Sequence, residues 1–111
     1  MKEARTIITL ESYLEDLAGR HPHCLLHLDV NWSGHARLYR NLVRDLYRRL
    51  RPRPHYLRYC LDHPPFDQMP ELSSLTPIIY YFQDGRLKTV IEGIHARHDL
   101  LARMQLPHRI T

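Results

Sequence analysis

The chain holds two cysteines, Cys24 and Cys60, and a thiol is the side chain best suited to redox chemistry. Cys24 begins an apolar run and Cys60 nearly closes another, so we expect two parallel strands with the thiols roughly 15–20 Å apart. A disulfide needs Cα atoms within about 7 Å, which argues against an internal bridge. Packing is the favoured role for both thiols, and Cys60, near a strand end, is the candidate for a reactive monothiol.

Hydroxyl and imidazole groups occur together in the segment Asn31-Trp32-Ser33-Gly34-His35-Ala36. A serine nucleophile needs a base and a third group that orients this base, and the spacing of Ser33 and His35 does not supply them. A helix N-cap is the simpler interpretation of Ser33. His35, His95 and His98 match no known metal-ligand spacing, so we expect neither a metal nor another cofactor.

A helix predicted over residues 34–50 carries arginines on one face and apolar residues on the other. This possible contact face consists of Arg37, Arg40, Arg44, Arg48 and Arg51. The usual interpretation of such a stripe is a solvated surface. As a binding surface it favours an acidic protein, because the glycine-rich loops and exposed aromatic platform that would indicate nucleic acid are lacking.

The length of 111 residues predicts a single domain spanning 1–111, and the net charge of +4 is moderately basic. No apolar run approaches the ~20 residues that span a bilayer, so we expect no membrane contact. The first residues do not resemble a signal peptide, and the expected location is cytoplasmic. The oligomeric state stays open.

Hydrophobic periodicity predicts an α/β domain with the order βαβαβαββα and a central mixed sheet flanked by helices. The Asp84-Gly85 pair between two β-rich runs indicates a hairpin. The expected strands are 5–10, 24–30, 55–61, 77–82 and 87–91, and the expected helices are 11–18, 34–50, 66–72 and 95–106.

Several segments resemble thioredoxins in their order and spacing. Residues 26–36 (LHLDVNWSGHA) are similar to the thioredoxin strand and Trp-Cys-Gly-Pro-Cys motif, with Ser33 and Ala36 in place of the cysteines. Residues 61–62, 75–85 and 92–94 resemble the next strand end, the cis-proline strand with its hairpin, and the glycine turn. The resemblance implies a thioredoxin-like fold without dithiol exchange, with His27 where thioredoxins keep a buried aspartate.

The resemblance also implies a groove where the motif, the cis-proline loop and the glycine turn converge. Its expected partner-binding residues are Trp32, Ser33, Gly34, His35, Thr76, Pro77, Gly93 and Ile94. Residues 90–95 (VIEGIH) further resemble cysteine-free thioredoxin-like chaperones of hydrogenase maturation. We therefore expect a protein-binding adaptor or assembly chaperone, whose client is an enzyme subunit under assembly. The alternative is a thiol–disulfide, monothiol or glutathione-linked oxidoreductase that uses Cys60.

Overall fold

The computed structural model describes residues 8–30 and 34–104. Most helices and strands lie within one or two residues of the predicted ranges. The elements are α1 (Leu10–Arg20), β1 (Cys24–Asp29), α2 (Gly34–Arg49), β2 (His55–Cys60), the 3-10 helices η1 (Phe66–Gln68) and η2 (Pro70–Ser74), β3 (Ile78–Gln83), β4 (Arg86–Glu92) and α3 (Arg97–Arg103).

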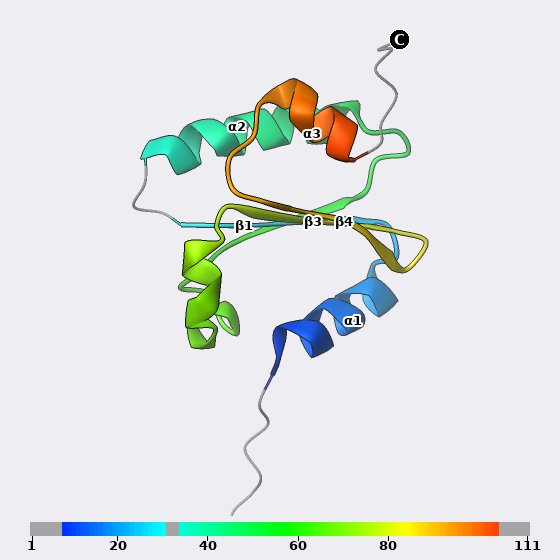
Figure 1. Cartoon of the computed structure of the whole chain (residues 1–111). Coiled ribbons are helices and arrows are strands. Elements are labelled where there is room, and N and C mark those ends of the chain that lie inside the picture. Colours follow the sequence, from blue (N-terminus) through cyan, green and yellow to red (C-terminus); the bar gives the residue numbers. More distant parts are fainter. Residues whose placement is uncertain (1–7, 31–33, 105–111) are drawn as a thin grey trace, which may run out of the picture.

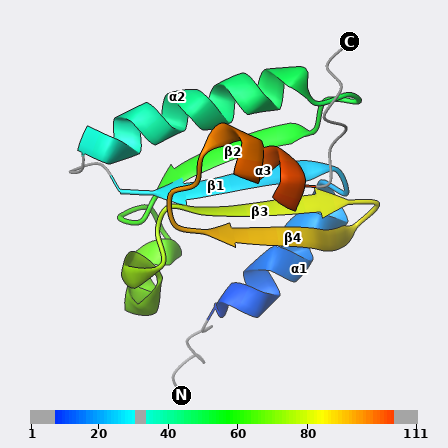
Figure 2. The ribbon, with the colours of Figure 1, turned by 45° about the horizontal axis from the view of Figure 1, so that its top comes forward.

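The described strands form one mixed sheet in the order β2-β1-β3-β4. β1 pairs in parallel with β2 and antiparallel with β3, which in turn pairs antiparallel with β4. Helices α2 and α3 cover one face of this sheet, while α1, η1 and η2 lie against the other (Figures 1 and 2). The predicted α/β class and the sandwich of helices around a central sheet are therefore confirmed.

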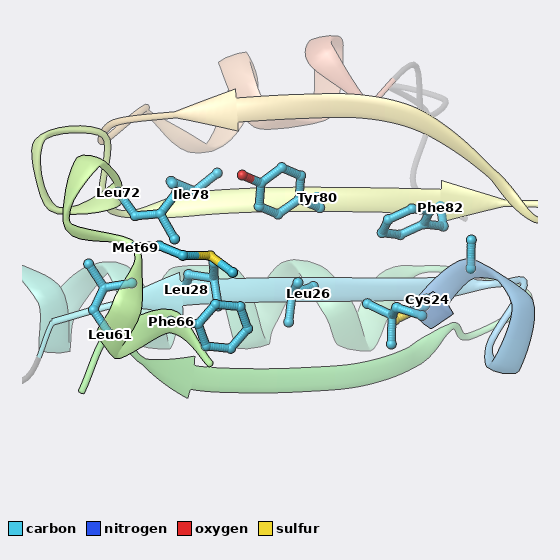
Figure 3. Packing of buried hydrophobic residues seen from close by; sticks show 12 residues of the cluster. Cys24, Leu26, Leu28, Leu61, Phe66, Met69, Leu72, Ile78, Tyr80 and Phe82 are labelled. Carbon is cyan, nitrogen blue, oxygen red and sulfur yellow. The ribbon is translucent and has the colours of Figure 1, made fainter. Parts of the chain in front are cut away.

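Every residue of β1 is buried, as its nearly continuous apolar run predicts for a central strand. Alternate side chains of the strand enter two separate cores. Cys24, Leu26 and Leu28 point to the side of α1 and the 3-10 helices, where Phe66 and Met69 join them (Figure 3). The core on the other side contains Leu25, Val43, Leu46, Ile79, Ile91 and Leu100. β1 therefore supports the contacts of both helical layers.

The predicted strand 5–10 is wrong at its end, and residues 5–7 lie outside the described residues. Thr9 is the N-cap of α1: its Oγ1 accepts a hydrogen bond from the Ser12 N–H, and the Ser12 Oγ accepts one from the Thr9 N–H, both at 3.1 Å. This reciprocal cap satisfies backbone donors that a helix start would leave unpaired. It makes Leu10 the first helical residue despite the β-branched run before it.

The predicted helix 66–72 is divided into η1 and η2 at Met69, whose φ of −124° is not helical. Pro70 follows at once and has no N–H to continue the hydrogen bonds of η1.

The last helix begins at Arg97 and not at residue 95, because Ala96 is still extended. Its predicted end at residue 106 lies outside the described residues. Across 8–30 and 34–104, no helix is both long and apolar enough to cross a bilayer.

Candidate functional site

Two of the predicted groove loops meet in the structure, the loop before β3 and the turn after β4. The Gly93 N–H donates a hydrogen bond to the Pro77 carbonyl oxygen at 2.8 Å. Gly93 has a φ of +86°, a left-handed conformation that glycine adopts without steric cost. The Thr76–Pro77 peptide bond is cis. Thr76, Pro77 and Gly93 are half-buried and Ile94 is exposed, so the structure brings four predicted residues to one place.

Only part of the segment that resembles the thioredoxin motif, residues 31–36, lies within the described residues. Trp32 and Ser33 lie outside the described residues, while Gly34 and His35 form the start of α2. The sheet register places the end of β1 opposite the start of β3 and the end of β4, since Ile78 pairs with both Leu28 and Glu92. The chain therefore leaves β1 toward the motif at the same sheet end as the two loops. A role of Trp32 in partner binding stays a prediction.

An apolar hollow of about 250 Å³ lies between α2 and the turn after β4. We call it the Leu38–Ile94 hollow; its lining residues are Leu38, Tyr39, Leu42, Ile94 and His95. Leu38 is 69% exposed and Ile94 57% exposed. Sequence reasoning missed Leu38. The available signal was a leucine outside the buried stripe of the helix, because Leu38 lies about 100° away from Tyr39 around the helix axis.

His95 is held firmly at the edge of this hollow. Its Nδ1 lies 2.6 Å from an Asp99 carboxylate oxygen and its Nε2 lies 2.9 Å from the Glu92 carbonyl oxygen. Arg103 Nε donates to the same Asp99 oxygen at 3.1 Å. The hydrogen bonds from Arg103 and His95 hold the pKa of Asp99 below its ordinary value. These contacts fix the turn that carries Ile94.

The predicted arginine face divides into two parts. Arg37, Arg44, Arg48 and Arg51 are exposed. Arg51 folds back on the end of α2, where its Nη1 donates to the carbonyl oxygens of Arg48 and Leu50, both at 2.7 Å. Arg40 is only 23% exposed and its Nε lies 3.2 Å from Asp29 Oδ2. Arg40 therefore binds within the protein. Partner binding by the exposed arginines stays a prediction.

A buried carboxylate, Asp29, receives Arg40 from α2 and Arg58 from the neighbouring strand β2. Arg58 Nε and Nη2 donate to the two oxygens of Asp29, each at 3.1 Å. The Asp29 side chain is 1% exposed, so it depends on these donors to replace water. Sequence reasoning missed this cluster. The signal was a charged residue, Asp29, inside the run 24–30 that predicts a fully buried strand.

The two cysteines lie as the parallel-strand prediction requires. Cys24 pairs with His55 at one end of β1 and Cys60 with Asp29 at the other, and no disulfide joins the thiols. Burial raises the pKa of Cys24 to about 11. Burial also raises the pKa of Cys60; the Arg58 guanidinium opposes this rise and the Asp29 carboxylate adds to it. Both environments favour the thiol over the nucleophilic thiolate.

We expect Cys60 to react slowly with iodoacetamide at pH 7, because its thiol donates to Asp29 Oδ1 at 3.6 Å and its pKa is raised. The alkylation rate should increase steadily up to pH 9, and it should be lower at pH 7 than that of free cysteine. Mass spectrometry of wild type, with Cys60→Ser as the control, measures this rate. A rate that reaches a plateau below pH 7 would contradict the expectation and support the oxidoreductase alternative.

His27 is a fully buried ring on the α2 side of β1. It meets the Tyr39 ring edge to face, with the ring centroids 6.0 Å apart. Neither ring nitrogen has a hydrogen-bond partner among the residues that the structure describes. Burial lowers the pKa of His27 to about 4, although the nearby Asp29 opposes this. The ring is therefore neutral at pH 7.

Comparison with known proteins rests on structure alone, since no family model and no curated protein matches the chain. Thioredoxin O1 from Arabidopsis thaliana matches with a TM-score of 0.64 and 15% identity, over 90% of this chain and 94% of that one. Thioredoxin O2 from the same plant gives 0.64 and 20%, over 86% and 83%. The thioredoxin of Plasmodium falciparum gives 0.62 and 11%, over 92% and 96%. The chain therefore has a thioredoxin-like fold.

Proposed function

We propose that this protein is a non-catalytic adaptor or assembly chaperone that binds a client protein at the Leu38–Ile94 hollow. The observation that carries this proposal is the exposure of two large apolar side chains, 69% for Leu38 and 57% for Ile94, around one hollow. A group of exposed apolar side chains is typical of a protein-interaction surface. Covering it would contribute about 25 cal/mol for each Å² of apolar area removed from water.

In the proposed complex, the client extends from this hollow along the loops of Pro77 and Gly93. Trp32, which lies outside the described residues, is a further predicted contact. A tryptophan offers the large amphipathic contact that often dominates binding energy. The exposed Arg37 and Arg44 on α2 favour a client with acidic residues, because guanidinium groups pair with carboxylates. An enzyme subunit under assembly fits the resemblance to hydrogenase-maturation chaperones.

The proposed function involves no dithiol exchange, because the chain lacks a pair of adjacent, reactive thiols. Ser33 and Ala36 stand where thioredoxins carry their cysteines. The two cysteines of the chain lie at opposite ends of paired strands, and the environments of both raise the thiol pKa. Exchange of a disulfide within this chain would need two adjacent thiols. Recognition without redox chemistry is the use of the fold that these observations support.

We expect a Leu38→Ser/Ile94→Ser double variant to capture at least about tenfold less client, because the two exposed apolar side chains of the hollow are removed. Affinity capture from the source cells, quantified by mass spectrometry, measures this. Trp32→Ala/Pro77→Ala, checked for folding, tests the rest of the groove in the same way.

The matched control is Val90→Ser on β4, which removes an exposed apolar side chain that does not line the hollow. It should capture the client as wild type does. The proposal is wrong if wild type captures no stoichiometric protein, or if the Leu38→Ser/Ile94→Ser variant captures the same protein in the same amount.

A further inference from the structure

A second hollow, of about 730 Å³, lies between α1 and the β3–β4 hairpin. Helix α1 lies on one side of the sheet, and α2 and α3 lie on the other (Figure 1). The lining residues therefore place the two hollows on opposite sides. Its apolar lining comes from Leu14 and Ala18 on α1, Phe82 on β3 and Leu87 on β4. Leu87 is 43% exposed, so an apolar surface faces solvent there. The volume lies within the range of about 300–1,000 Å³ that is typical of ligand pockets.

A backbone contact holds the walls of this hollow in place. The Gly85 N–H, at the tip of the hairpin, donates to the Pro22 carbonyl oxygen at 3.0 Å. Pro22 lies between α1 and β1, so this bond ties the hairpin to the connection after α1. At the other end, the capping interaction of Thr9 sets the start of α1. A preformed hollow of this kind costs little ordering on binding.

Within the described parts of the chain, the charged residues that line this hollow are all acidic. Glu11, Glu15 and Asp84 line it and are exposed, and none of its described lining residues is a lysine, arginine or histidine. The nearby Arg20 is paired with Asp16 at 3.0 Å, and Lys88 donates to Gln83 at 2.9 Å. Three carboxylates therefore surround an apolar floor on a protein whose net charge is +4.

We propose that this acid-rimmed hollow, formed by Glu11, Glu15, Asp84 and the apolar floor beneath them, binds a cationic segment of a partner protein. The segment places a leucine-like side chain against Leu14 and Leu87, and flanking arginines or lysines pair with the carboxylates. Charge complementarity selects such a segment, since an acidic one would be repelled by all three carboxylates. The site is independent of the Leu38–Ile94 hollow and goes beyond the proposed function.

The test is the fluorescence anisotropy of a labelled peptide, Gly-Arg-Arg-Leu-Leu-Arg-Arg-Gly, titrated with the full chain. We expect saturable binding that weakens at least about tenfold in Glu11→Gln/Glu15→Gln and in Leu87→Ser. Two matched peptides, with glutamates for the arginines or serines for the leucines, should bind at least about tenfold more weakly. Circular dichroism confirms that each variant is folded.

Two control variants separate this proposal from others. Asp45→Asn/Glu92→Gln removes two exposed carboxylates outside the hollow and should leave the affinity unchanged. Leu38→Ser/Ile94→Ser should also bind the peptide with the affinity of wild type. The test of this site is therefore independent of the test of the proposed client site.

Four results would overturn the proposal. The first is no binding of the arginine peptide, and the second is an arginine peptide that binds no better than the glutamate peptide. The third is equal binding of the serine peptide, which would indicate attraction between charges alone. The fourth is a concentration-dependent dimer of the chain that Glu11→Gln/Glu15→Gln abolishes, which would show a second copy as the occupant.

Discussion

Replacing Asp29 with alanine is expected to lower the free energy of unfolding by about 3 kcal/mol, near the lower end of the effect of breaking a buried ion pair. The change removes the acceptor of three hydrogen bonds from Arg40 and Arg58. Both guanidinium groups would then lie partly buried without their counter-charge. Because they are 23% and 27% exposed, water can partly replace the carboxylate, which limits the loss. Urea denaturation measures the difference.

Asp45→Ala is the matched control for this prediction. Asp45 lies exposed on α2, so its removal should change the unfolding free energy by no more than about 0.5 kcal/mol. Asp29→Asn keeps the shape and one acceptor but loses the charge, and it should fall between wild type and Asp29→Ala. Equal stability of Asp29→Ala and Asp45→Ala would show that the two arginines do not depend on this carboxylate.

Replacing His27 with leucine is expected to stabilise the protein in acid. The folded state keeps the pKa of His27 at about 4 against an ordinary value of 6.5, so below pH 6.5 the unfolded chain binds a proton that the folded chain rejects. Stability from this group is thus complete above pH 6.5 and falls as the pH decreases to about 4. The loss reaches up to about 3 kcal/mol, at about 1.4 kcal/mol for each pH unit between the two values.

Urea denaturation of wild type and His27→Leu at pH 7.5, 5.5 and 4 measures this effect. The advantage of the leucine variant should increase as the pH falls, and a smaller advantage should remain at pH 7.5, because leucine leaves no ring nitrogen without a partner. His98→Leu is the control, since His98 is exposed. A constant difference between wild type and His27→Leu at all three pH values would contradict the prediction.

The sequence determined most of the helices and strands because their signals are local. The apolar run of β1 predicts a strand buried on both faces, and its six residues are all buried. The stripe of Tyr39, Val43 and Leu46 predicts the buried face of α2, and these residues do enter one core. Asp84-Gly85 predicts the hairpin, where both residues have positive φ. Periodicity and turn chemistry act over a few residues, so they can be read without a fold.

Part of the candidate site also followed from the sequence, through the resemblance to thioredoxins. The meeting of Pro77 with Gly93 was expected, and a hydrogen bond joins them. The hollow beside them was not expected, because Leu38 becomes important only when the turn carrying Ile94 packs near α2. A helical wheel shows that Leu38 is off the buried face, but it cannot show which distant residue lies next to it.

Tertiary structure alone decided the charges inside the molecule. Asp29 binds arginines 11 and 29 residues away, and only the packing of α2 and β2 around β1 brings them together. The helical pattern predicted that Arg40 is exposed, but its side chain is mostly buried against Asp29. Likewise, Glu11, Glu15 and Asp84 share a rim only because the hairpin folds back onto α1. Local pattern determines the elements, whereas contacts between residues distant in sequence depend on how those elements pack.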